Sequence, residues 1–138
     1  MRVLIVDDEL TSRVILQKFL SHYGETHLCG NGKEAIDAFK NALDQGNAVD
    51  LICMDVMMPE MDGPTALIRV RAMEEEKGIA RQQGVKVIMT TGLSDKEKEI
   101  SDLACRCDAI LIKPVRKDVL RQVLEKLGFI ASDQSVQK

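Results

Sequence analysis

Short apolar segments alternate along the chain with longer segments in which apolar residues recur every three or four positions. Four of the apolar segments are five or six residues long, which predicts buried β-strands, and a fifth is weaker. The predicted strands are 2–6, 49–54, 85–90 and 108–112, with the weaker one at 26–29. Strands that are apolar nearly throughout are typical of a parallel sheet covered on both faces.

Helical periodicity fills the segments between these strands. The predicted helices are 11–22, 33–45, 64–77, 95–105 and 117–127. Local signals at helix ends agree with this assignment. They are the capping-box pairs Asn31/Glu34 and Ser94/Glu97, Pro64 as a first helical residue, and Gly128 after the last helix.

Five strand–helix units in succession predict an α/β fold. The natural architecture is a flavodoxin-like, doubly wound (βα)5 domain with a five-stranded parallel sheet in the order 2-1-3-4-5. We expect this domain to occupy residues 1–128 and residues 129–138 to form a polar C-terminal tail, with no room for an output domain.

Composition narrows the class of protein. The chain has 138 residues, 45% of them hydrophobic, which is enough for one domain with its own core. Acidic residues number 22 and basic residues 19, with no long basic block, so we expect no nucleic-acid partner. The chain has no apolar stretch of membrane-span length and no signal-peptide pattern, which predicts a cytoplasmic protein without a membrane partner. Four cysteines without paired C-x-x-C spacing favour reduced thiols over a zinc site.

Reactive side chains follow four of the five predicted strands. In an open α/β sheet, ligands bind at the carboxyl ends of the strands, where the strand order reverses. The residues at these ends are Asp7, Asp8 and Glu9 after the first strand, Asp55 after the third, Thr90 and Thr91 at the fourth, and Lys113 after the fifth. The predicted order places the first and third strands side by side, so Asp7, Asp8 and Asp55 should share one crevice.

Three carboxylates in one crevice repel one another unless a cation shares them. Mg²⁺ suits such a site because it binds carboxylates, keeps several waters and accepts phosphate oxygens as further ligands. Lys113 could neutralise a phosphoryl oxygen, and an aspartate is able to form an aspartyl phosphate. The arrangement therefore indicates Asp55 as a nucleophile assisted by a metal and a lysine.

Each of these residues also has a purely structural explanation. Asp7, Asp8 and Glu9 could complement the dipole of the first helix, and Asp55 could begin a turn. Thr91 could be an ordinary strand residue, and Lys113 could be a solvated strand end. None of these explanations accounts for all four residue types meeting at the same edge of one sheet.

The motifs "LIVDDE", "MDVMMPEMDG", "MTTG" and "LIKP" occur in an order and spacing that resembles the receiver domains of two-component response regulators, such as the single-domain chemotaxis regulators. The resemblance covers about residues 2–127. It implies that Asp55 is the phospho-acceptor and that Asp8 binds Mg²⁺, or Mn²⁺, directly. Asp7 would act nearby or through a water molecule, and the backbone carbonyl of Met57 would be a further ligand.

The same resemblance assigns the remaining site residues. Thr91, which precedes Gly92, would bind a phosphoryl oxygen by its hydroxyl and Lys113 by its ammonium, whereas Thr90 would be an interior strand residue. A cis peptide bond is expected before Pro114.

Two features depart from the family pattern. The segment 72–84 is long and charged, and it either extends the preceding helix or forms a surface loop. Ile110 stands where many receivers have a tyrosine or phenylalanine that moves inward on phosphorylation.

The implied function is that of a stand-alone regulator and phosphoprotein. A histidine kinase or histidine phosphotransfer protein would phosphorylate it, and it would then bind a downstream protein through the helix at 95–105, the strand at 108–112 and the helix at 117–127. It would be no enzyme beyond slow loss of its own phosphoryl group. The main alternative is a receiver-fold interaction module that works without phosphorylation. An aspartate-dependent phosphatase is disfavoured by Met57, which stands where a general acid is needed, and a flavin carrier by the acids after the first strand.

Overall fold

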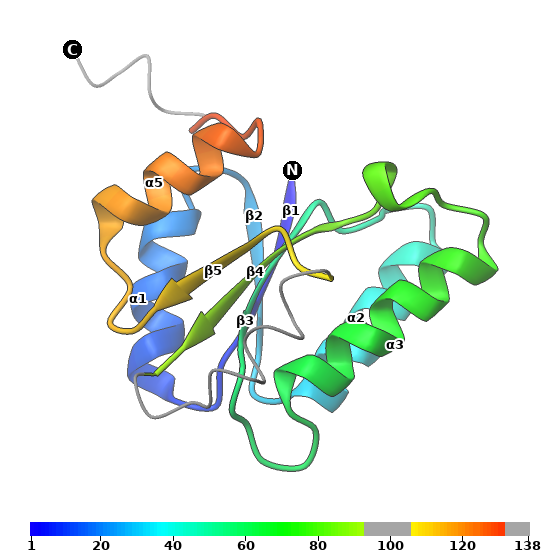
Figure 1. Cartoon of the computed structure of the whole chain (residues 1–138), viewed down its shortest axis with the longest axis horizontal. Helices are drawn as coiled ribbons and strands as arrows, with labels where there is room; N and C mark the ends of the chain where they lie inside the picture. Colours follow the sequence, from blue (N-terminus) through cyan, green and yellow to red (C-terminus); the bar gives the residue numbers. More distant parts are fainter. Residues whose placement is uncertain (93–105, 132–138) are drawn as a thin grey trace.

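A computed structural model of the chain describes residues 1–92 and 106–131. Within these residues, five parallel strands form one sheet in the order β2-β1-β3-β4-β5 (Figure 1). The strands are β1 (Arg2–Val6), β2 (Glu25–Cys29), β3 (Leu51–Asp55), β4 (Lys86–Thr91) and β5 (Ala109–Ile112). Every predicted strand is confirmed to within two residues. The weaker prediction at 26–29 is a full edge strand that pairs with β1 over five residues.

Helices connect the strands and cover both faces of the sheet. They are α1 (Leu10–Leu20), α2 (Gly32–Asp44), α3 (Gly63–Glu76) and α5 (Lys117–Lys126), with a short 3-10 helix, η1 (Arg81–Gln83). Their ends lie within two residues of the predicted ends. The helix predicted at 95–105 and its Ser94/Glu97 cap lie outside the described residues. Among the helices of residues 1–92 and 106–131, none combines the length and the hydropathy needed to cross a membrane.

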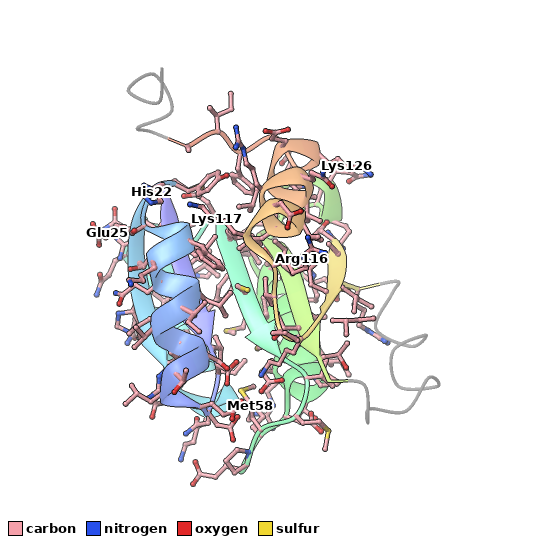
Figure 2. The ribbon with its side chains drawn as sticks, turned by 90° about the vertical axis from the view of Figure 1, so that its left-hand side faces the viewer. His22, Glu25, Met58, Arg116, Lys117 and Lys126 are labelled. Atoms are coloured by element: carbon pink, nitrogen blue, oxygen red, sulfur yellow. The ribbon has the colours of Figure 1, made fainter. Side chains whose placement is uncertain are left out.

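The two faces of the sheet carry separate apolar cores. Helices α1 and α5 cover one face and α2 and α3 the other (Figure 1). Figure 2 looks onto the first face, with α1 and α5 side by side. On β1, Val3 and Ile5 belong to the α1/α5 core, whereas Leu4 and Val6 belong to the α2/α3 core. Because successive side chains of a strand point to opposite faces, burial on both faces explains why β1 and β3 are apolar nearly throughout.

Side-chain caps fix two of the helix starts. Asn31 accepts a hydrogen bond from the Glu34 N–H at 2.9 Å, and the Glu34 carboxylate accepts one from Gly30 N–H at 2.8 Å. The predicted capping box is therefore present, with the return bond made one residue earlier. Helix α3 is capped by Asp62, which accepts from Thr65 N–H at 2.9 Å, and Pro64 is its second residue rather than its first.

The chain remains packed against the fold directly after helix α5. Gly128 has the positive φ of 94° expected of a residue that ends a helix. Phe129, expected in the tail, packs against the α1/α5 core, and its N–H bonds to the carbonyl of Leu124 at 2.9 Å.

The charged segment at 72–84 is part helix and part turn. Helix α3 runs to Glu76, the chain reverses at Gly78 with φ 73°, and η1 then leads to β4. Glu74 on this segment is only 4% exposed, and it accepts hydrogen bonds from the Val85 N–H at 2.6 Å and from Arg71 at 2.9 Å.

Arg71 links α3 to the start of two strands. Its guanidinium donates to the carbonyl of Val85 at 2.8 Å and to the carbonyl of Arg106 at 3.0 and 3.1 Å. It also lies 3.4 Å from the Asp108 carboxylate, which in turn accepts from the Val87 N–H at 2.8 Å. We call Arg71, Glu74 and Asp108 the buried ion cluster. It lies at the amino ends of β4 and β5, at the opposite edge of the sheet from Asp55.

Candidate functional site

Three carboxylates meet at the carboxyl edge of the sheet, as predicted. Asp7 follows β1 and is fully buried, Asp55 is the last residue of β3 and is 6% exposed, and Asp8 is exposed. Strands β1 and β3 are direct neighbours, with Val6 opposite Met54. Ligand oxygens of Asp7, Asp8 and Asp55 all lie within 4.8 Å of one another.

Lys113 brings a positive charge to two of these carboxylates. Its ammonium lies 2.9 Å from Asp7 Oδ2 and 3.0 Å from Asp55 Oδ2. Its backbone N–H donates to the carbonyl of Thr91 at 2.7 Å, which anchors it beside the end of β4. The peptide bond between Lys113 and Pro114 is cis, as predicted. The side chain therefore reaches from β5, across β4, to residues on β3 and β1.

The loop after β3 is held close to the end of that strand. Met58, labelled in Figure 2, lies in this loop. The Gly63 N–H donates to the carbonyl of Val56 at 2.9 Å, and a Cβ at Gly63 would overlap the backbone oxygen of Asp55. Only glycine therefore lets α3 begin so near the end of β3. The sequence motif contains this glycine, but its contact with Asp55 depends on the folded loop.

Electrostatic interactions set the protonation of the two central groups. Burial raises the pKa of Asp55 to about 6, and the nearby charge of Asp7 also raises this pKa. Two hydrogen bonds to the carboxylate act in the opposite direction: one from Lys113, and one from the Met57 N–H, which lies 3.3 Å from Asp55 Oδ1. Burial lowers the pKa of Lys113, but hydrogen bonds and attraction to Asp7 and Asp55 outweigh it, so the pKa is raised. Lys113 therefore stays charged, while Asp55 takes up a proton more readily than an ordinary aspartate.

This arrangement has the composition of a divalent-cation site. Three carboxylates and one ammonium leave an excess of negative charge in a half-buried crevice, and hard cations such as Mg²⁺ prefer carboxylate oxygens and water. The exposure of Asp8 gives a hydrated ion access from solvent. The Met57 side chain is 58% exposed, so its predicted contribution rests on its backbone carbonyl, and that role remains a prediction.

The two threonines at the end of β4 point to opposite faces. Strand β4 alternates between the cores, with Ile88 in the α1/α5 core and Met89 in the α2/α3 core, so Thr90 faces α1/α5 and Thr91 faces α2/α3. Thr91 is the last residue of β4, and its hydroxyl lies 3.3 Å from the Gly92 carbonyl oxygen. Thr90 is the register partner of Asp55 and is fully buried. The structure thus places Thr91 at the strand exit, where the resemblance requires a hydroxyl.

The raised pKa of Asp55 gives a testable dependence of stability on pH in metal-free buffer. A carboxyl that binds its proton more tightly in the folded state adds stability at low pH, and this contribution is lost as the pH rises from about 4 through the folded value of about 6. Relative to Asp55→Asn, the parent should lose on the order of 2 to 3 kcal/mol of unfolding free energy between pH 4 and pH 7. Urea unfolding of both proteins measures this difference. A difference in unfolding free energy between the two proteins that does not change with pH would contradict the raised pKa of Asp55.

Comparison with known proteins identifies the family. A family model described as "Response regulator receiver domain" matches residues 3–125. The chain belongs to the response regulator receiver domain family, as the motifs predicted. It is 33% identical over 115 residues to the transcriptional regulatory protein AruR of Pseudomonas aeruginosa, covering 83% of this chain and 43% of AruR. It is 32% identical over 126 residues to the regulatory protein AtoC of Escherichia coli, covering 91% of this chain and 24% of AtoC. The chain thus spans less than half the length of these curated relatives.

Solved structures confirm the fold. The receiver domain of the histidine kinase CKI1 from Arabidopsis thaliana, complexed with Mg²⁺ and BeF₃⁻, matches with a TM-score of 0.72 and 30% identity over 90% of this chain and 89% of that one. A structure of the Saccharomyces cerevisiae phosphotransfer protein Ypd1 with the receiver domain of the response regulator Ssk1 matches with a TM-score of 0.74 and 29% identity, covering 91% of this chain and 87% of that one.

Proposed function

We propose that Asp55 accepts a phosphoryl group from a histidine kinase or a histidine phosphotransfer protein in a Mg²⁺- or Mn²⁺-dependent reaction, and that phosphorylation changes the affinity of the domain for a downstream protein. The observation that carries this proposal is the meeting of Asp55 with Asp7, Asp8 and the Lys113 ammonium at one edge of the sheet. The domain acts in the cytoplasm as a switch, with at most slow loss of its own phosphoryl group.

The chemistry follows from these positions. A carboxylate oxygen of Asp55 forms a bond to phosphorus while the bond from phosphorus to the donor histidine nitrogen breaks, and the nitrogen keeps the electron pair. Lys113 is placed to neutralise charge on the phosphoryl oxygens. When bound by Asp7, Asp8, Asp55 and the Met57 carbonyl, the divalent cation supplies further positive charge to those oxygens. Thr91 binds a phosphoryl oxygen and reports its presence.

The related receiver structures support the metal and the phosphoryl donor in this proposal. The CKI1 receiver was crystallised with Mg²⁺ and BeF₃⁻, and the Ssk1 receiver with the phosphotransfer protein Ypd1. In the present chain, exposed apolar residues lie beside the acidic crevice and offer contact area to a donor protein. They are Leu10, Val14 and Ile15 on α1, and Met57 in the loop after β3.

The downstream partner is assigned to a different surface. By resemblance to receiver domains, this surface consists of β5, α5 and the helix predicted at 95–105. The structure describes β5 and α5, whereas residues 95–105 lie outside the described residues. Ile112 on β5 is 58% exposed, whereas Ile110 is partly buried against the α2/α3 core. We infer a protein partner here, with no part for nucleic acid or membrane.

Incubation with acetyl phosphate and Mg²⁺ tests the proposal. Intact-mass analysis should show one added phosphoryl group on the parent, and none when EDTA removes the metal, because the carboxylates alone repel the donor. Parent protein that gains no phosphoryl group with Mg²⁺ would refute the proposal and favour a module that binds partners without phosphorylation.

Thr91 should be needed for the response and not for the transfer. Thr91→Ala should still accept the phosphoryl group, but the change that Mg²⁺ and BeF₃⁻ cause in hydrogen exchange of β5 and α5 should be largely lost. Thr91→Ser, which keeps the hydroxyl, is the control and should respond as the parent does. A full response in Thr91→Ala would assign the switch to other residues.

A further inference from the structure

Thr90 stands out within the part of the chain that the structure describes. Its side chain is fully buried, and its hydroxyl is the one buried side-chain oxygen or nitrogen in residues 1–92 and 106–131 for which no hydrogen-bond partner is found. A buried hydroxyl without a partner costs roughly 1–3 kcal/mol relative to one that is bonded. Valine has nearly the same shape and would fill the position without this cost. The hydroxyl is therefore more easily explained by a second state of the site in which it is used.

The position of Thr90 ties it to the acidic crevice. It is the direct register partner of Asp55 on one side and of Leu111 on the other. Cys53 and Leu111 both belong to the α1/α5 core. Asp55 comes two residues after Cys53, and Lys113 comes two residues after Leu111, so each has the same side-chain direction as its core neighbour. Thr90, Asp55 and Lys113 therefore lie on the same face of the sheet.

The Lys113 side chain crosses β4 on the face that carries Thr90. Strand β4 lies between β3 and β5, as Figure 1 shows, and neighbouring strands are about 4.8 Å apart. Because Lys113 begins after β5 and its ammonium reaches Asp55 on β3, its side chain crosses β4 on the face that carries Thr90. The ammonium, with its three N–H donors, thus ends at Asp55, the register partner of Thr90 on the same face of the sheet.

The Lys113 ammonium and the proposed metal share two carboxylates. The ammonium of Lys113 already contacts Asp7 Oδ2 and Asp55 Oδ2, and the proposed metal binds the same two carboxylates together with Asp8. Cations repel each other, so metal binding weakens at least one of the two ammonium contacts. Lys113 is half-buried, and an N–H that loses its acceptor there costs free energy unless another acceptor is within reach.

We propose that Thr90 is a positioning residue for Lys113: its hydroxyl accepts an N–H of the Lys113 ammonium when a divalent cation occupies the carboxylates. The hydroxyl thereby lowers the cost of metal binding and keeps the ammonium over β4, where it meets the incoming phosphoryl group. This inference rests on the proposed function, because it takes the acidic crevice to be a metal site.

Mg²⁺ affinity, measured by calorimetric titration, tests the inference directly. Thr90→Val should bind Mg²⁺ about ten- to a hundredfold more weakly than the parent, as expected for loss of one hydrogen bond to a charged group. Thr90→Ser should restore the affinity to within about twofold. In EDTA, Thr90→Val should melt at the same temperature as the parent or higher, because an unpaired buried hydroxyl has been removed. If Thr90→Val does not fold, Thr90→Ala also lacks the hydroxyl and gives the same comparison.

Lys113→Met tests whether the effect of Thr90 depends on the Lys113 ammonium. Without the ammonium, the Thr90 hydroxyl has no donor to accept from. Lys113→Met and the double variant Lys113→Met/Thr90→Val should therefore bind Mg²⁺ with equal affinity. An unchanged affinity in Thr90→Val, or the same loss with and without Lys113, would overturn the inference and leave the proposed function standing. A parent protein that binds no Mg²⁺ would overturn both.

Discussion

Replacing Arg71 with leucine should lower the free energy of unfolding by about 3–5 kcal/mol, the range found when one partner of a buried ion pair is removed. The loss is expected because Glu74 is 4% exposed and would lose its ion-pair partner, the guanidinium 2.9 Å away. The carbonyls of Val85 and Arg106 would lose a donor at the same time. Urea unfolding measures the change.

Arg121→Leu is the matched control for this prediction. Arg121 also lies on a helix and pairs with a glutamate, Glu125, at 3.6 Å, but both side chains are more than half exposed. Exposed pairs of this kind contribute about 0.3–0.5 kcal/mol, so the control should unfold nearly as the parent does. Equal, small losses in Arg71→Leu and Arg121→Leu would show that the buried ion cluster does not stabilise the fold. Because the cluster lies at the opposite edge of the sheet from Asp55, folded Arg71→Leu should still accept a phosphoryl group.

Mg²⁺ should raise the melting temperature of the parent, and Asp8→Asn should remove most of this rise. A ligand that binds only the folded state stabilises it by about 2.7 kcal/mol when its concentration is one hundred times its dissociation constant. Asp8 is the exposed member of the three carboxylates, so its loss weakens the site without leaving a buried group unpaired. Differential scanning calorimetry with and without Mg²⁺ gives both values.

Asp37→Asn controls for the general effect of removing one negative charge. Asp37 is exposed on α2, away from the carboxyl edge of the sheet, and its variant should keep the full stabilisation by Mg²⁺. An equal rise in the parent and Asp8→Asn would place the bound metal elsewhere.

The order of the strands and the meeting of the site residues were predictable because both depend on patterns that are local in sequence. Each apolar strand ends at a reactive residue, and the order of a doubly wound sheet then brings Asp7, Asp55 and Lys113 to one edge. The pairing of Lys113 with both carboxylates at 2.9 and 3.0 Å follows from the same topology.

No pattern in the sequence predicted the buried ion cluster. Glu74 stands in the run "MEEEK", which has the composition of a solvated helix face, and the three residues that follow it in the run are exposed. Its burial depends on Arg71, one helical turn earlier, and on Val85, which follows it by eleven positions. Asp108 is thirty-seven positions from Arg71. Contacts between residues so far apart become visible only once the register of β4 and β5 is known.

Thr90 shows a similar limit. The sequence assigned it to the interior of a strand, which is confirmed, but its lack of a hydrogen-bond partner depends on the side chains of the two neighbouring strands. The helix N-cap at Asp62, by contrast, is of a kind that sequence can predict. Aspartate is a preferred N-cap residue, and its side chain accepts from the N–H three residues later, here that of Thr65.

The identity of the phosphorylated residue tests the central claim most directly. After incubation with acetyl phosphate and Mg²⁺, borohydride reduces an aspartyl phosphate to homoserine, and peptide mass spectrometry locates that residue in the chain. The account predicts homoserine at position 55 in the parent and at no position in Asp55→Asn. Homoserine at Asp7, Asp8 or any other acidic position in the parent, or a parent without any, would contradict the assignment of Asp55 as the phospho-acceptor.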